Sequence, residues 1–448
     1  GGEPMHDRVV GRLKGRHQVR PSRSLAVAGL LSAGIYVTLA ARLPWWRHGG
    51  VPQSWAGLLG KGLGTFALCL GVAGMLMALY VWGMRFTRTG NSADRWIIWA
   101  FACVFALTLL WLLPITSDLF AYLRQAHMLT DLGANPLLQA PADVADSLVQ
   151  TYSTLYDTRP TVYGPAWVLL SAVGTSGPHD LPMGLLYLKG LSAAAFLAAA
   201  WLVEKLLLEM RPGAALEGLY FFAWNPLVLL MAVGDGHNDI VLVALVLLAL
   251  WLLLRERWAL SLAVLVLSVW VKYVSLVLVP LFGLYLWRRL VRQQGSGRLR
   301  PVISGSMAAV SVSLLVVAPL CPPEALVGIA ERLLHPLNWH LGSGRLPTLL
   351  LGSGLCLYCL AYLLIAVRFW RGSGSFQHLV NSSFLALLLV FIFGAARSQP
   401  WHLLWPAAVA GLSDNRWARG VVLGLSGVML AVQVGVEWGM PGLRLFVD

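Results

Sequence analysis

Residues 239–254, DIVLVALVLLALWLLL, are apolar without a break after the opening aspartate. They lack both the alternation of a half-exposed strand and the polar face of a surface helix, so they indicate a helix surrounded by protein or lipid. Of the 448 residues, 58% are hydrophobic and 12% are charged, whereas a soluble domain carries about twice that share of charge. The composition excludes a water-soluble enzyme and a disordered chain, and the continuous runs exclude a β-barrel. The sequence predicts an all-α polytopic membrane protein.

Thirteen apolar stretches are candidate spans. Several are shorter than the roughly 20 residues that a full crossing needs, so we expect about 11 to 13 transmembrane helices. The stretch 257–287 could be one bent helix. We expect a single transmembrane domain over 25–437, between a basic segment 1–24 and a short tail 438–448. The stretches are 25–43, 56–84, 95–115, 183–206, 217–233, 239–254, 257–271, 273–287, 302–320, 348–367, 379–395, 401–412 and 420–437.

The distribution of basic residues predicts the orientation of the chain. Six Lys and Arg residues precede the first span, and most of the others fall in loops on the same side once the spans alternate. By the positive-inside rule the N-terminus is cytoplasmic, and the odd span count leaves the C-terminus outside. The net charge of +13 is therefore explained by topology, and no nucleic-acid partner is expected.

Two long loops fall on the predicted outer side, at 116–181 and 321–347. Connections of this length are usually functional. Within the first loop, residues 118–132 (DLFAYLRQAHMLTDL) carry apolar residues close to a helical period. We expect an amphipathic helix that lies in the membrane interface.

Polar residues that are unusual near membrane spans all fall at the predicted outer ends of those spans. Ionisable groups at membrane depth are rare and point to function. Four separate connections supply them, and their convergence on one face is stronger evidence than any residue alone. They are Asp118, Asp235, His237, Asn238, Asp239, Lys272, Arg397 and His402.

Several of these polar residues also have an ordinary structural interpretation. Asp118 could cap the helix that follows it, and Asn238 and Asp239 could merely begin the next span. His237 has no partner at metal-ligand spacing, so the sequence predicts no metal site there.

The cations and tryptophans have ordinary interpretations too. Lys272 could extend its ammonium group to the lipid headgroups, and Arg397 could anchor the chain at the interface. Trp401 and Trp405 lie near span ends, which is typical of the aromatic belt of membrane proteins.

A carboxylate beside cationic groups at the outer leaflet suits the transfer of a group from a lipid phosphate to a hydroxyl. The carboxylate would take the proton of the acceptor, and Arg, Lys and His would stabilise the departing phosphate. The sequence has no Walker A motif and no glycine-rich dinucleotide motif after a strand. Because nucleotides are not supplied outside the membrane, a lipid-linked donor follows.

Around these positions the chain resembles a known family, the bacterial polyprenyl-phosphomannose-dependent α-1,6-mannosyltransferases of lipomannan-type glycan synthesis, which are GT-C membrane glycosyltransferases. Five segments carry the resemblance, in family order, over about residues 95–410. Each is weakly specific alone, but five in order on one face are more specific. They are 117–136 (SDLFAYLRQAHMLTDLGANP), 160–167 (PTVYGPAW), 224–243 (WNPLVLLMAVGDGHNDIVLV), 269–280 (VWVKYVSLVLVP) and 399–406 (QPWHLLWP).

The resemblance implies a GT-C-type helical bundle in a bacterial plasma membrane, with its active site on the outer face. Asp118 would be the catalytic base. A β-linked polyprenyl-phosphate sugar that gives an α-linked product requires inversion, which needs one base and no covalent intermediate. The implied substrate-binding residues are Tyr122, Tyr163, His237, Asn238, Asp239, Lys272, Arg397 and His402. Lys272 and Arg397 are the candidates for the donor phosphate, and the segment 237–239 would face a sugar.

The chain departs from the family in two respects. Many GT-C enzymes present paired acids in the first outer loop, but here Asp118 follows a serine and the next acid is Asp131. A divalent metal is therefore not favoured, and no cofactor is expected. The chain also ends soon after its last span, so we expect the loops 116–181 and 321–347 to recognise the acceptor, a glycan or glycolipid.

Other functions remain open from the sequence. The donor could carry another lipid-linked sugar, and water could replace the acceptor. Arg332, His335, His340 and Arg345 keep open a ligase or polymerase that moves whole glycans. A lipid or glycan flippase is a further alternative, although transporters often show internal repeats and none is evident here.

Overall fold

A computed structural model describes residues 22–48, 53–87, 92–151, 158–174, 181–292, 300–334, 345–394 and 399–440. Its named elements are all helical, and none of the described residues forms a strand. The α-helices are α2 (Arg23–Arg42), α3 (Trp55–Leu59), α4 (Leu63–Thr87), α5 (Ser92–Leu109), α6 (Asp118–Thr130), α7 (Ser147–Thr151), α8 (Pro165–Val173), α9 (Leu181–Met210), α10 (Ala215–Ala223), α11 (Pro226–Leu229), α12 (Asp239–Leu254), α13 (Trp258–Val271), α14 (Val279–Arg292), α15 (Arg300–Val317), α16 (Pro323–Leu334), α17 (Arg345–Arg371), α18 (Phe376–Leu389), α19 (Leu404–Leu412) and α20 (Arg416–Glu437).

The helices confirm the prediction of an all-α polytopic membrane protein. Every predicted span coincides with helix, although some spans are built from two shorter elements. Among the described residues, seven helices are long and apolar enough to cross a membrane, or eight if a bent pair counts as one span. The remaining predicted spans fall on shorter or more polar helices such as α12 and α13, so the number of crossings stays a prediction.

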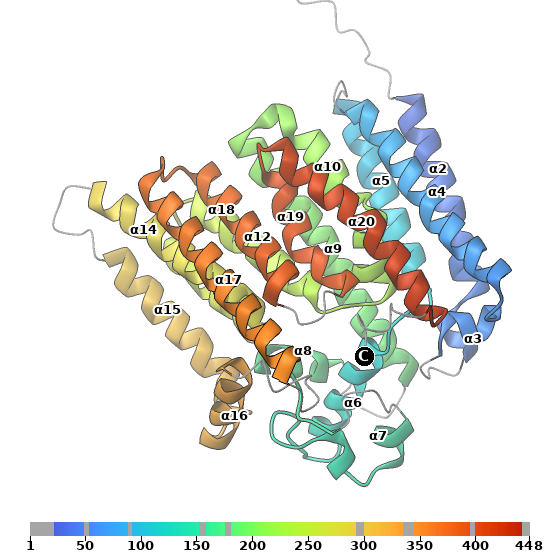
Figure 1. The fold of residues 1–448 in the computed structure, drawn as a ribbon, viewed down its shortest axis with the longest axis horizontal. Helices are drawn as coiled ribbons and strands as arrows, with labels where there is room; N and C mark the ends of the chain where they lie inside the picture. The colour runs from blue at the N-terminus through green and yellow to red at the C-terminus, as the bar shows by residue number, and fades with distance from the viewer. Residues whose placement is uncertain are drawn as a thin grey trace, which may run out of the picture.

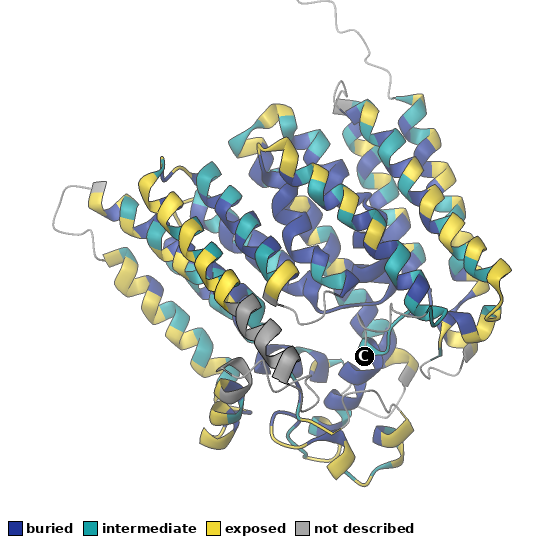
Figure 2. Ribbon diagram, viewed as in Figure 1, coloured by how far each residue is buried: buried dark blue, intermediate teal, exposed yellow. Residues whose placement is uncertain are grey.

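The helices stand roughly side by side, with α2, α4 and α5 at one flank and α14, α15 and α17 at the other (Figure 1). Helices α9, α10, α12 and α19 lie between the flanks (Figure 1), and most residues of α10, α12 and α19 are buried (Figure 2). Helices α6, α7, α8 and α16, which come from the long segments 116–181 and 321–347, gather at one end of the bundle (Figure 1). The chain breaks before α12 and after α13 also lie there, because His237 contacts Asp118 and the Val271 carbonyl accepts from Gly164.

One break shapes the candidate site most directly. Helices α10 and α11 meet at a bend of 52°, because Asn225 caps α11 and Pro226 occupies its first position. A π-helix, η5 (Leu230–Gly234), follows. Gly236 then turns the chain with φ of +72°, and an added Cβ there would lie 2.9 Å from Leu119 of α6. A glycine is therefore required for the chain to pass so close to α6.

A second break separates α13 from the short 3₁₀ helix η6 (Tyr273–Leu278). Lys272 lies between them in extended conformation, with φ of −155° and ψ of 126°. The stretch 257–287 is thus divided at Lys272 and is not one bent helix, which agrees with one of the two alternatives from the sequence. The break turns the lysine toward α12 instead of continuing the apolar run.

Helix α6 confirms the predicted helix but not its predicted interfacial position. Nine of its residues are buried, because the helix packs against α8 and α9. Tyr122 and Phe120 are almost fully enclosed. The apolar residues of 118–132 therefore pack against other helices of the same chain. A helix that lay on the lipid surface would bury fewer of its residues in protein.

Candidate active site

Asp118 is the first residue of α6, and its carboxylate lies at the centre of the candidate site. Its Oδ2 accepts a hydrogen bond of 3.3 Å from the Tyr163 hydroxyl and lies 3.3 Å from Nδ1 of His237. The preceding Ser117 makes no capping hydrogen bond with its side chain. The Asp118 side chain is 14% exposed, so its carboxylate is held in place and still reachable.

The contacts of Asp118 outweigh its burial. Burial alone would raise the pKa of the Asp118 carboxyl. Contact with His237, the charge of Lys272 and the Tyr163 hydroxyl act in the opposite sense and lower this pKa below its usual value. The carboxylate is therefore ionised at neutral pH and free to accept a proton.

His237 is enclosed between two carboxylates and an indole ring. Its Nδ1 faces Asp118, and its Nε2 lies 3.5 Å from Oδ2 of Asp235 and 3.3 Å from the Thr116 hydroxyl. The imidazole stacks on Trp401 with ring centres 4.2 Å apart. Burial alone would lower the pKa of His237, but the two aspartates raise it to about 9. His237 is thus a cation at neutral pH and cannot itself be a base.

Asp239 and Lys272 form an ion pair at the start of α12. Lys272 Nζ lies 2.9 Å from both carboxylate oxygens of Asp239, and the indole of Trp405 donates to the same carboxylate. The ammonium also lies over the rings of Tyr163 and Trp405, at 5.8 and 5.5 Å from their centres. An ammonium has three N–H donors, so one remains after Asp239 has taken two.

Asn238 has a buried side chain with unmet hydrogen-bonding capacity. The residue is fully buried, and neither its amide nitrogen nor its amide oxygen has a hydrogen-bond partner among the described residues. Its backbone N–H donates to the Tyr122 hydroxyl at 3.5 Å. Buried polar groups are nearly always paired, so this amide is suited to a ligand hydroxyl.

Three aromatic residues pack against one another beside Asp118. Tyr122 packs edge-on against Tyr163 and Trp167, with ring centres 5.0 and 4.9 Å apart. The backbone N–H of Gly164 donates to the carbonyl of Val271, and a Cβ at Gly164 would collide with the Trp270 carbonyl. The segment 163–165 is therefore pressed against the end of α13, which brings Tyr163 to Asp118.

Of the two remaining predicted site residues, His402 and Arg397, the structure describes only His402. His402 lies in the 3₁₀ helix η9 (Pro400–Leu403) and stacks on Trp405 with ring centres 4.5 Å apart. Its Nδ1 accepts from the backbone of Gln399. Burial, followed by the charges of Lys272 and His237, lowers the pKa of His402 well below its usual value, so the ring is neutral. Arg397 lies outside the described residues.

Four residues at the site were not named as catalytic or substrate-binding residues from the sequence, although Asp235 was among the polar residues expected on the same face. Asp235 is fully buried and accepts from the backbone of Ile115. Lys189 is fully buried in α9 and donates to the carbonyls of Val233 and Gly234, at the end of the π-helix. Trp401 stacks on His237 and the Trp405 indole donates to Asp239, contacts that the aromatic-belt interpretation did not predict. A lysine in an apolar helix was the one signal that could have pointed to Lys189.

The described residues hold no group of three or more His, Cys, Asp or Glu side chains arranged to bind a metal ion. The site instead alternates acids and cations, with Asp118, His237 and Asp235 in one row and Asp239 and Lys272 beside it. Such an arrangement can accept a proton at one point and stabilise a developing negative charge at another.

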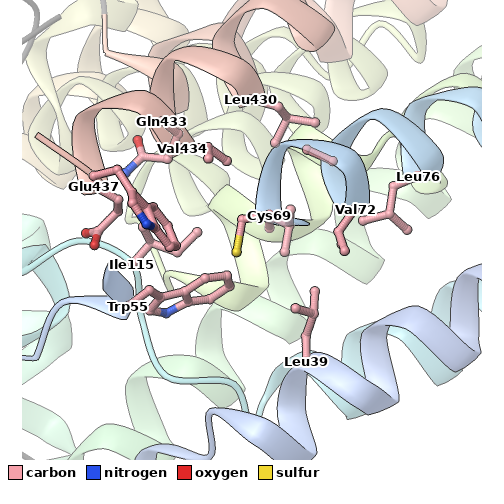
Figure 3. A pocket seen from close by; sticks show the side chains of 13 residues that line it. Leu39, Trp55, Cys69, Val72, Leu76, Ile115, Leu430, Gln433, Val434 and Glu437 are labelled. Atoms are coloured by element: carbon pink, nitrogen blue, oxygen red, sulfur yellow. The ribbon is translucent and has the colours of Figure 1, made fainter. Parts of the chain in front are cut away.

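The structure also contains an apolar cavity, whose lining residues are shown in Figure 3. About 500 Å³ of empty space, part of it open to the surroundings, lies between α2, α3, α4, α20 and the π-helix. Leu76, Val72 and Leu430 line it, and Glu437 and Gln433 are its polar members. Its wall includes Ile115, whose backbone N–H donates to Asp235, so the cavity reaches the edge of the polar site.

Comparison with known proteins identifies the class as a membrane glycosyltransferase. Residues 22–288 match the family model described as α-(1→6)-mannopyranosyltransferase, N-terminal domain. The match covers more than half of the chain, and the protein belongs to this family.

Curated relatives agree with the family. The chain is 24% identical over 391 residues to α-(1→6)-mannopyranosyltransferase A of Mycobacterium tuberculosis, covering 81% of this chain and 74% of that protein. It is 24% identical over 194 residues to the A enzyme of Corynebacterium glutamicum, which covers 43% of this chain and 39% of that protein. The B enzyme of the same organism is 26% identical over 195 residues, or 41% of this chain and 31% of that protein.

Proposed function

We propose that this protein transfers mannose from a polyprenyl-phosphate donor to a hydroxyl of a glycan or glycolipid acceptor at the outer face of a bacterial membrane. The names of its relatives support mannose as the sugar and an α-(1→6) linkage as the product. The predicted orientation, with the cytoplasmic basic loops at the far end of the helices, supports the outer face.

Asp118 is the base in this proposal, and one comparison among the acids supports the choice. Asp235 and Asp239 are fully buried, and Asp239 is already paired with Lys272. His237 is protonated. Asp118 alone combines an ionised carboxylate with a partly exposed side chain, and this is the observation that carries the assignment.

The proposed reaction is a single displacement with inversion. The acceptor oxygen forms a bond to the anomeric carbon while the bond from that carbon to the phosphate oxygen breaks. The acceptor proton passes to Asp118, and the electron pair leaves with the polyprenyl phosphate. In this proposal the third N–H of Lys272 donates to that phosphate, with Arg397 as a second candidate, and such preorganised cations stabilise the developing charge.

Asn238 and His402 complete the proposed sugar site. The unsatisfied amide of Asn238 can both donate to and accept from sugar hydroxyls. His402 is neutral, and because its Nδ1 accepts from Gln399, its Nε2–H can donate to a sugar hydroxyl. Asn238 directly precedes Asp239 in the chain, and His402 stacks on Trp405. Both residues therefore belong to the cluster around Asp239 and Trp405.

The apolar cavity beside Asp235 supports a lipid-linked substrate. We propose that it receives an apolar lipid chain, because its walls are almost wholly hydrocarbon. Ala73→Phe would fill the cavity and should raise the KM for the lipid substrate severalfold. Met75→Phe is the matched control, because Met75 is 55% exposed on the same helix and does not line the cavity.

The proposed donor is tested by incubating purified protein with a short oligomannoside and one donor at a time. Polyprenyl-phosphate mannose should give an α-linked product whose anomeric configuration is opposite to that of the donor, as read by NMR. Polyprenyl-phosphate glucose and a nucleotide-linked mannose should give little product. Equal use of the nucleotide sugar would contradict the lipid-linked donor, and a retained configuration would contradict the single displacement.

A further inference from the structure

A second, more open cavity lies at the opposite end of the bundle from Asp118. It contains about 1230 Å³ of empty space. Arg416 at its wall is the first residue of α20, whereas Glu437 of the apolar cavity is the last residue of the same helix. At a rise of about 1.5 Å per residue, the two ends of α20 are roughly 33 Å apart. Under the predicted orientation, this cavity faces the cytoplasmic leaflet.

Positive charge predominates in the wall of this cavity. Arg211, Arg416 and Arg419 line it, against Glu217 and Asp414. Three guanidinium groups and two carboxylates leave one positive charge in excess. An anion with a single negative charge would neutralise the cavity.

The carboxylates are already engaged with other groups. Glu217 pairs with Arg419 at 3.0 Å, and Asp414 accepts from the amide of Asn381 at 2.8 Å. The arginines keep unused capacity. Arg211 donates through one terminal nitrogen to the Leu412 carbonyl, while its Nε is buried without a hydrogen-bond partner among the described residues.

The electrostatics of Arg211 agree with an incompletely compensated charge. Burial lowers the pKa of Arg211, and the carboxylates of Asp414 and Glu217 only partly oppose that effect. A guanidinium has five N–H donors in a fixed fork, which matches the oxygens of phosphate.

The apolar part of the wall distinguishes a lipid from a soluble anion. Met84, Phe221 and Leu423 line the same cavity as the arginines. Beside it, Trp417 is 53% exposed on the outer surface of α20, as expected of an aromatic residue at a membrane interface. A ligand with a charged head and an apolar body fits both parts of the wall.

We propose that this cavity binds the phosphate group of an anionic membrane lipid, held by Arg211, Arg416 and Arg419. A phosphodiester headgroup carries the single negative charge that the wall leaves uncompensated. The site is separate from the candidate active site, and nothing in the proposed transfer reaction requires it.

The test measures lipid binding to the full chain purified in a neutral detergent. Phosphatidylglycerol, phosphatidylcholine or inorganic phosphate is titrated in turn, and the shift of the thermal unfolding midpoint gives the apparent Kd. Phosphatidylglycerol should raise the midpoint saturably. Arg416→Gln should weaken its binding on the order of tenfold, because it removes one charged hydrogen-bonding partner. Arg416 is exposed, so the variant should fold.

Arg257→Gln is the matched control, because Arg257 is exposed on the same predicted face and does not line the cavity. It should leave the Kd unchanged. The proposal is overturned if both variants bind phosphatidylglycerol like the wild type, or if both lose affinity equally. It is also overturned if phosphatidylcholine or inorganic phosphate acts as well as phosphatidylglycerol at the same concentration. Mannose transfer by Arg416→Gln from polyprenyl-phosphate mannose, without added phosphatidylglycerol, should match the wild type, which separates this site from the active site.

Discussion

His237 Nδ1 lies 3.3 Å from Oδ2 of Asp118, although Asp118 begins α6 and His237 lies in the turn before α12. The contact couples their charges. It keeps the pKa of Asp118 low and contributes to the pKa of about 9 at His237. A proton that reaches Asp118 therefore arrives beside a cation, which favours its prompt release once the product has left.

Replacing His237 by Gln should weaken transfer and alter its pH dependence. The variant removes a cation next to Asp118, so the pKa of Asp118 should rise, and the acidic limb of kcat/KM should move to higher pH. The rate at neutral pH should fall by roughly 10²-fold, as for the loss of one preorganised charged group. Measuring kcat/KM from pH 4 to 9 checks this. An unmoved acidic limb would show that the base is not coupled to His237.

The same histidine should make stability depend on pH. Its pKa is about 9 in the folded protein against about 6.5 in an unfolded chain. Its contribution is therefore complete below about pH 6.5 and is lost as the pH rises through about 9. The free energy of unfolding should fall by on the order of 3 kcal/mol over that range. Thermal unfolding of wild type and His237→Gln should show the decline only in the wild type. Parallel curves would contradict the raised pKa.

Lys272 and Asp239 should separate stability from activity in a double-variant experiment. Lys272→Met leaves a buried carboxylate without its cation and should cost about 3–5 kcal/mol of unfolding free energy. Adding Asp239→Asn should restore most of that loss, because the buried charge is gone. Transfer should nevertheless stay roughly 10²–10³-fold below the wild type, since no cation would meet the donor phosphate. Recovery of transfer together with stability would make Lys272 a structural residue only.

Gly236→Ala should destabilise the turn that carries the site. The left-handed conformation costs a residue with a Cβ about 1–2 kcal/mol, and the new Cβ would crowd Leu119. The variant should also lower kcat, because His237 follows directly. Gly283→Ala in α14 is the control, since nothing lies within 4 Å of a Cβ there, and it should be neutral or slightly stabilising. Equal unfolding midpoints for the two variants would contradict this.

The helices could be predicted from the sequence because an apolar run specifies a helix in lipid locally. DIVLVALVLLALWLLL becomes α12 with the predicted bounds 239–254. The bend at Asn225 and Pro226, by contrast, divides one predicted span into two helices. Likewise, 56–84 divides into α3 and α4 around Gly60, which has φ of +95°. These breaks depend on single residues inside runs that look uniform by hydropathy.

The site was predictable as a set of residues but not as a set of contacts. Asp118, His237, Asp239 and Lys272 were recognisable because charged groups are rare near spans. Their pairing depends on how α6, α12 and α13 meet, which no local pattern encodes. The burial of α6 and the hydrogen bond from the Trp405 indole to Asp239 could not be predicted for the same reason.

The measurement that tests the central claim most directly is mannose transfer by Asp118→Asn, a change that keeps the size of the side chain. Asp143→Asn is the control, since Asp143 is an exposed acid of the same long segment, 116–181. With polyprenyl-phosphate mannose and an oligomannoside, Asp118→Asn should transfer roughly 10²–10⁴-fold more slowly than the wild type, with an unchanged unfolding midpoint or a small shift. Asp143→Asn should retain its rate. An Asp118→Asn protein as active as the wild type would contradict the account, and the base would then have to be sought at Asp235 or Asp239.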